Sequence, residues 1–139
     1  MALGATLYRE GLELVQDACF TQCDQSVPYN IRKMAQLLRK IAQLPEVFIC
    51  ANDKIAMVVM KALSLIDYQV PQDIGVMGFD NSDLAKLSNP SLATVDNFTK
   101  QQAECVAQRM LERIGNPEMR VQRILTPVKF IPGDSIRDL

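Results

Sequence analysis

Two short apolar runs that each end in a polar pair constrain the fold of this chain more than any other feature. The first lies in residues 47–56 and stops at Asn52-Asp53; the second lies in residues 70–81 and stops at Asp80-Asn81. One segment of helical length separates them. This pattern predicts a β-α-β unit with two parallel strands. Open α/β sheets bind their ligands at the carboxyl ends of such strands, where following helix N-termini also point backbone N–H groups.

Length and composition describe an ordinary soluble domain. The chain has 139 residues, 48% of them apolar and 22% charged, which suits one domain with a real core. Its 15 basic and 16 acidic residues are interspersed and sum to −1, so no basic stripe is available for a nucleic-acid backbone. No apolar run is long enough to span a bilayer, and the start lacks the features of a secretory signal. We therefore expect no membrane partner and a cytoplasmic location.

Cysteine and histidine usage argues against metal and triad chemistry. The four cysteines, Cys19, Cys23, Cys50 and Cys105, have no C-x-x-C spacing, and the chain contains no histidine. The usual zinc partner and the commonest general base are thus both missing. We expect mostly buried, reduced thiols, no metal, no cofactor and no catalytic residues.

The remaining elements follow from periodicity and punctuation. The predicted elements are a helix over residues 2–10 ended by Gly11, a strand over 16–22, a helix over 30–43, a doubly buried strand over 47–50, a helix over 55–66 that Asp53 can cap, a strand over 74–79, a helical turn over 83–87, an extended stretch over 92–95, a last helix ending near Ile114 and a final strand over 121–131.

The helix over residues 55–66 is apolar around nearly its whole circumference. One sheet can cover only one side of such a helix, so it must bury a second face on another surface. A partner subunit is the simplest candidate, and Met57, Val58 and Met60 are the expected contacts.

Several motifs in order resemble the LacI (lac repressor) type of bacterial transcription regulators. Residues 70–81, VPQDIGVMGFDN, are similar to the family's V-P-x-D-[IV]-x-[VL]-x-G-[FY]-D, and residues 47–56, VFICANDKIA, to its [AV]-[FI]-x-x-x-N-D-x-[MI]-A. Residues 90–95, PSLATV, and 124–127, ILTP, match two further family motifs. A lone G-[FY]-D would be weak, but the ordered set is specific.

The resemblance implies an α/β fold with an open, mostly parallel sheet and helices on both faces, of the periplasmic-binding-protein type. Members have two lobes with the ligand between them, and this chain corresponds to about the C-terminal half of the effector-binding domain. By that mapping residues 11–80 and 121–131 form the C-terminal lobe. Residues 92–114 cross back to a largely missing N-terminal lobe and leave the last helix uncovered. The DNA-binding headpiece has no counterpart, so DNA would be bound only through that absent part.

The resemblance also implies ligand-binding residues. Asn52 and Asp80 stand where the family contacts its effector, and Asp24 and Gln25 stand at a third contact. Amide and carboxylate groups suit a polyhydroxylated or amine-bearing ligand. The alternative for Asn52 and Asp80 is a purely structural helix cap. Many sugar-binding members place an aromatic ring where Gln25 stands, and an arginine where Gly133 stands, so the ligand is expected to be more polar or smaller than a stacked hexose.

Three functions remain open at this point. The first is the small-molecule effector-binding and dimerisation part of a LacI-type regulator, whose two-fold interface by resemblance includes Leu84 and Leu87 as well as the helix over 55–66. The second is a lobe of a secreted solute-binding protein. The third is an enzyme that uses Asp24, Asp53 or Asp80 as acid or base, which the absence of any nucleophile, phosphate or metal motif disfavours.

Overall fold

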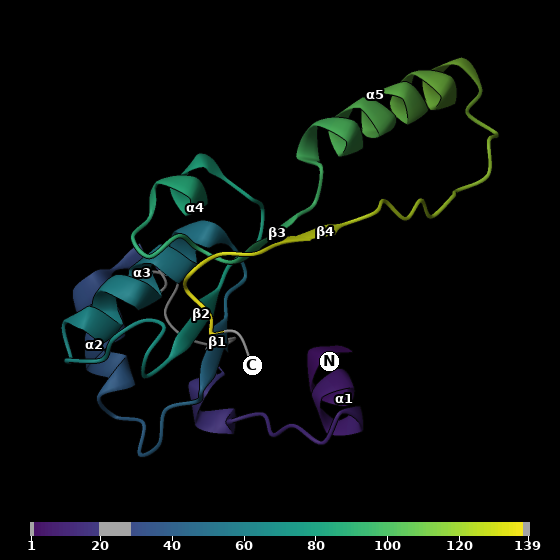
Figure 1. The fold of residues 1–139 in the computed structure, drawn as a ribbon. Coiled ribbons are helices and arrows are strands. Elements are labelled where there is room, and N and C mark those ends of the chain that lie inside the picture. The colour runs from purple at the N-terminus through teal and green to yellow at the C-terminus, as the bar shows by residue number, and fades with distance from the viewer. Residues whose placement is uncertain (1, 20–28, 138–139) are drawn as a thin grey trace.

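The body of the chain is built on a parallel strand pair joined by a helix (Figure 1). In this computed structural model, which describes residues 2–19 and 29–137, β1 (Val47–Ile49) pairs with β2 (Gly75–Met77). Helix α3 (Asp53–Ser64) connects them. Val47 lies opposite Gly75 and Ile49 opposite Met77. The predicted β-α-β unit and the α/β class are therefore confirmed.

Helix α3 is covered by the chain's own elements. It packs against α2 (Ile31–Leu38), against the short helix α4 (Asp83–Leu87) and against β2. Ala56 and Leu63 have no exposed surface, and Val58 and Met60 are both less than a tenth exposed. The second face of this helix is therefore covered largely by α2 and α4, and a contact of the helix with a partner subunit stays a prediction.

One face of β1 is open among the described residues. Phe48 is buried, but Val47 and Ile49, which alternate with it, are each about half exposed. Neighbouring side chains of a strand point to opposite faces of its sheet. The expectation that this strand is buried on both faces is therefore wrong for the described structure: an apolar sequence does not specify what covers each face.

An antiparallel ribbon carries the last helix away from the body. β3 (Thr94–Asp96) pairs with β4 (Lys129–Ile131), and α5 (Thr99–Gly115) projects beyond the ribbon (Figure 1). Ala93, just before β3, also bridges to Met77 in parallel, so ribbon and sheet are continuous. The apolar stripe of α5 is more than half exposed at every large member, namely Val106, Met110, Leu111 and Ile114. Among the described residues, the stripe therefore lacks a covering surface.

The chain returns to β2 after β4. The buried Ser135 hydroxyl donates to the Val76 carbonyl at 2.6 Å and accepts from the Ala93 N–H at 2.8 Å, while Val76 N–H donates to the Ser135 carbonyl at 2.9 Å. A Cβ at Gly133 would lie only 2.5 Å from Ala93 N. This close approach explains why position 133 is a glycine, since the returning backbone passes directly against the backbone at Ala93.

Other predicted elements agree to different degrees. Helix α1 (Ala2–Arg9) is confirmed, with Gly11 at φ +72°, and α4 has the predicted bounds. Helix α2 is confirmed but ends at Leu38, earlier than predicted. The chain then turns, so that Ile41 and Leu44 pack against the core from outside a helix.

Two strand predictions are wrong in whole or in part. Residues 16–18 of the strand predicted over 16–22 form a single 3-10 turn, η1 (Gln16–Ala18), and residues 20–22 lie outside the described part. The strand predicted over 121–131 is real only at β4. Residues 121–128 are rich in apolar side chains but pair with no other strand in the described structure, and a strand exists only where a neighbour accepts its hydrogen bonds.

Candidate functional site

Polar side chains gather where β1, β2 and β3 end. We call Asn52, Asp80, Asn81, Asp96 and Asn97 the polar shelf. Backbone hydrogen bonds join the three strand ends. The Asp53 N–H donates to the Phe79 carbonyl and the Asp80 N–H donates to the Val95 carbonyl, each at 2.9 Å. The predicted residues Asn52 and Asp80 therefore follow strand ends that are bonded to each other.

Hydrogen bonds hold most of the polar shelf in place. Asn97 Nδ2 donates to Asp80 Oδ1 at 3.0 Å, and Asn81 Nδ2 donates to Asp96 Oδ2 at 3.0 Å. The other Asp96 oxygen accepts the Phe98 backbone N–H at 2.8 Å. That backbone bond, followed by the Asn81 bond, lowers the pKa of Asp96 below its ordinary value of 3.8. Asp96 is thus an ionised carboxylate that fixes the Asn81 side chain.

Three polar groups of the shelf remain available. Within the described residues, Asp80 Oδ2, Asn81 Oδ1 and Asn52 Nδ2 have no hydrogen-bond partner. They supply two acceptors and one donor. A ligand hydroxyl both donates and accepts, so this set can bind a polyhydroxylated molecule.

Asn52 serves two purposes. Its Oδ1 accepts the Ile55 N–H at 2.9 Å and so caps α3. The alternative role of Asn52 as a helix cap is therefore correct for its side-chain oxygen, while its amide nitrogen stays available to another partner. Asp80, by contrast, caps no helix: α4 begins at Asp83 with Ser82 before it.

The sequence did not identify the whole shelf. The predicted ligand-binding residues did not include Asn81, Asp96 or Asn97. An apolar stretch ending in a polar pair is the pattern that located Asn52 and Asp80, and Val95 followed by Asp96-Asn97 repeats it. Asp24 and Gln25 lie outside the described residues, and their assignment stays a prediction.

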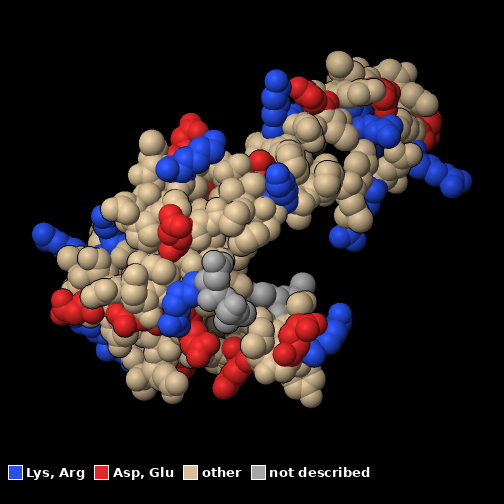
Figure 2. All heavy atoms as spheres, in the orientation of Figure 1, with Lys and Arg blue, Asp and Glu red and all other residues tan. Residues whose placement is uncertain are grey.

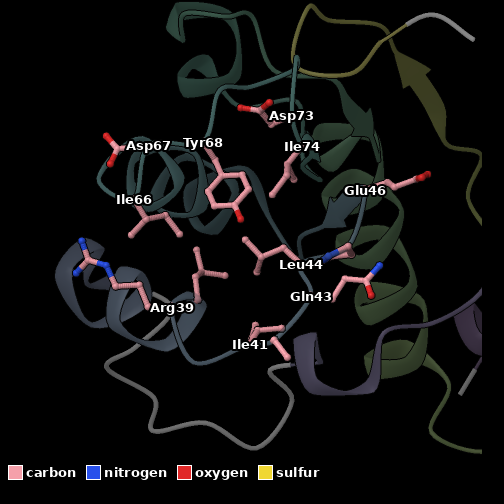
Figure 3. A pocket seen from close by; sticks show the side chains of 13 residues that line it. Arg39, Ile41, Gln43, Leu44, Glu46, Ile66, Asp67, Tyr68, Asp73 and Ile74 are labelled. Carbon is pink, nitrogen blue, oxygen red and sulfur yellow. The ribbon is translucent and has the colours of Figure 1, made fainter.

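A cavity of about 560 Å³ lies at the opposite end of the sheet (Figure 3). It is lined by residues that precede β1 and β2, including Leu44, Glu46 and Ile74. In Figure 3 Tyr68, Leu44 and Ile66 point towards its centre, whereas the charged ends of Arg39 and Glu46 point away. We place the candidate site at the polar shelf rather than at this cavity, because the shelf lies at the carboxyl ends of the strands, where open α/β sheets bind their ligands.

The candidate interface residues divide into two groups. Val58 and Met60 are buried inside the chain and Met57 is partly buried. Leu84 is 49% exposed and Leu87 is 83% exposed, both on α4. Of the five residues, only the two on α4 present a largely open apolar surface.

The described residues contain no metal-ligand cluster, and the face of the molecule seen in Figure 2 carries charges of both signs. No cluster of three or more potential metal ligands occurs in residues 2–19 and 29–137, and no helix there is long and apolar enough to cross a membrane. Acidic and basic side chains alternate over the face seen in Figure 2.

Comparison with known proteins identifies the family. A family model described as a periplasmic binding protein-like domain matches residues 5–136. The chain belongs to this family.

The relatives that this chain resembles include transcription regulators. The ribose operon repressor of Escherichia coli (strain K12) is 35% identical over 92 residues, which cover 66% of this chain and 28% of the relative. The HTH-type transcriptional repressor PurR of Escherichia fergusonii is 30% identical over 129 residues, covering 93% and 38%. A LacI-type regulator from Bifidobacterium animalis subsp. lactis has a similar structure, with a TM-score of 0.79, 25% identity and coverage of 96% and 47%.

The periplasmic binding protein-like chain thus spans about a third of the length of these two curated relatives. The resemblance to LacI-type regulators is confirmed, and both curated relatives are repressors. The reading as a secreted solute-binding lobe is correspondingly less supported.

Proposed function

We propose that this chain is the effector-binding part of a LacI-type transcription regulator, and that its polar shelf holds a sugar or a similar polar metabolite. The observation that carries the proposal is the set of unpartnered groups, Asp80 Oδ2, Asn81 Oδ1 and Asn52 Nδ2, at bonded strand ends. In a dry cleft each such group favours a ligand that satisfies it. Binding, not chemistry, is the role of the site.

A small sugar fits the proposal best. Gln25 stands where many sugar-binding members place a stacking ring, which argues for a ligand recognised by hydrogen bonds alone. A pentose offers several hydroxyls on a compact frame. One relative is a ribose operon repressor, so D-ribose is the first probe for this chain.

The shelf is an open surface in this chain, and we propose that a second lobe completes it. Residues 11–80 and 121–131 would form one lobe, and residues 92–114 would cross to the other. The exposed stripe on α5, including Met110 and Leu111, is the surface that the other lobe would cover. DNA would be bound by a separate headpiece, in the cytoplasm where such repressors act.

We further propose that two copies associate through α4. Leu84 and Leu87 are large, exposed apolar residues on one five-residue helix. Because a two-fold contact places the same patch on both subunits, each leucine would meet α4 of its partner. Met57, which is partly buried, lies on the neighbouring helix and would flank the contact.

Calorimetric titration of the purified chain with D-ribose, followed by other pentoses and hexoses, tests the proposal. Asp80→Ala should weaken binding about tenfold or more, the effect of removing a charged hydrogen-bond partner of the ligand. Asp83→Ala is the matched control, since this nearby carboxylate has 92% of its side chain exposed. Equal affinity of the Asp80→Ala variant and the unchanged chain would contradict the proposed site.

A further inference from the structure

The turn between β2 and α4 has an unusual backbone. Asp80 and Asn81 are consecutive residues with φ of +105° and +48°. Aspartate and asparagine reach positive φ more often than most residues, but two in succession persist only where the surroundings hold them. Because this turn carries two of the three available ligand groups, whatever holds it also sets the geometry of the polar shelf.

Asp53 is the side chain that holds this turn. It is 1% exposed, and its Oδ2 accepts the Ser82 backbone N–H at 2.7 Å. Its Oδ1 accepts the Thr94 hydroxyl at 2.5 Å. One buried carboxylate therefore joins the start of α3 to the end of the turn and to β3.

The Thr94 hydroxyl extends this connection to Asn81. A hydroxyl has a single hydrogen to donate, and Thr94 spends it on Asp53. Its lone pairs are thereby turned towards the Asn81 N–H, which donates to Thr94 Oγ1 at 3.3 Å. Two successive backbone N–H groups, those of Asn81 and Ser82, are thus fixed by Asp53, one directly and one through Thr94.

The backbone that follows β2 packs closely against the Asp53 carboxylate. A Cβ at Gly78 would overlap Asp53 Oδ1, so the position is occupied by glycine, which has no Cβ. An acidic residue in the first turn of a helix is often explained by the helix dipole alone. Here Asn52 provides the cap of α3, and both oxygens of Asp53 bond to residues outside that helix.

We propose that Asp53 is the positioning residue of the ligand site. It does not reach the ligand, because it is buried beneath the shelf, but it fixes Asp80 and Asn81 in the conformation that presents their free oxygens. This inference rests on the proposed function for its consequence in binding. Its structural part, the fixing of the turn, stands on the hydrogen bonds alone.

Substitutions that keep shape but break one bond test the proposal. In Asp53→Asn an NH₂ group can face the Ser82 N–H, so that two donors meet; in Thr94→Val the hydroxyl is removed. Each should weaken D-ribose binding about tenfold, the expected result of losing a buried hydrogen bond. Thr94→Ser retains the hydroxyl and should restore affinity to within about threefold of the unchanged chain.

Two controls separate positioning from general loss of stability. Asp73 also accepts a backbone N–H at 2.7 Å, that of Gln69, but at the other end of the sheet, so Asp73→Asn is the same chemical change away from the turn. Ile74→Val shortens a buried residue beside it. Both should keep ribose affinity while lowering the unfolding temperature. If either weakens binding as much as Asp53→Asn, or if Asp53→Asn binds normally, the proposal is overturned.

Amide hydrogen exchange measures how firmly the backbone of the turn is held, and it needs no ligand. Exchange at Asn81 and Ser82 should accelerate at least about tenfold in Asp53→Asn relative to the amides of β2, as loss of their local partners requires. Unchanged exchange, or equal acceleration throughout β2, would overturn the inference. Failure of the unchanged chain to bind D-ribose or any other sugar would instead contradict the proposed function, and the exchange result would still decide the role of Asp53.

Discussion

Asn52 offers a test in which one side chain has two separable roles. Its Oδ1 caps α3 through the Ile55 N–H, and its Nδ2 is one of the groups available to a ligand. Asn52→Asp keeps a capping oxygen and removes the donor, whereas Asn52→Ala removes both. The two variants should therefore differ in stability but share a defect in binding.

The expected magnitudes follow from these bonds. Loss of an N-cap costs about 1 kcal/mol of unfolding free energy, with a range of about 0.5–2. For a domain of this size that corresponds to a fall of about 2–6 °C in the unfolding midpoint. Asn52→Asp should show little of this fall, because aspartate is an equally good cap and its charge suits a helix N-terminus. Loss of the donor should weaken ligand binding about 3–10-fold in both variants.

Thermal unfolding of both variants, followed by circular dichroism, measures the first role, and calorimetric titration with the best sugar from the ligand screen measures the second. An Asn52→Asp chain that unfolds as early as Asn52→Ala would refute the capping argument. Normal ligand affinity in both variants would refute the assignment of Asn52 Nδ2 to the site.

Three further outcomes are expected. The pKa of Asp96 is lowered on folding. Its contribution to stability is therefore present above about pH 4 and is lost as the pH falls through the folded pKa. Denaturant unfolding across this range should show that the unfolding free energy of Asp96→Asn depends less on pH than that of the unchanged chain. Burial raises the pKa of the Cys50 thiol to about 12, so mass spectrometry after iodoacetamide treatment at pH 8 should find Cys50 unmodified in the folded chain and modified after denaturation. Leu87→Asp should shift the sedimentation mass from dimer to monomer, and Met110→Asp should not; a monomeric unchanged chain would contradict the proposed interface.

Local sequence patterns predicted the elements whose causes are local. The polar pairs that end β1 and β2 and the stripe of α5 are properties of short stretches, and the structure has each of them. The cap of α3 that was expected from Asp53 is instead made by Asn52, one residue earlier. The family resemblance then supplied Asp80 as a ligand residue. Asp96 and Asn97 also follow an apolar stretch, but their position beside Asp80 and Asn81 depends on the chain around β3 lying next to that around β2, a contact that no local pattern specifies.

Other predictions failed or stayed open where the outcome depends on what a segment packs against. Residues 121–128 have the composition of a strand but no neighbouring strand in the described structure. A partner subunit was the simplest candidate to cover the second face of α3, and in the structure α2 and the five-residue helix α4 pack against this helix. Periodicity shows that a face is apolar, and only the tertiary structure shows which element meets it.

The contact between Ser135 and Val76 also sets an order of events during synthesis. The two residues are 59 positions apart, so the ribosome must add all of β3, α5 and β4 before the free edge of β2 can receive its last partner. Until then Val76 and its neighbours expose unsatisfied backbone groups, the kind of edge on which nascent chains associate wrongly. A codon change that slows translation between these positions would lengthen that exposure. It would lower the yield of folded protein and leave the stability of the folded molecule unchanged.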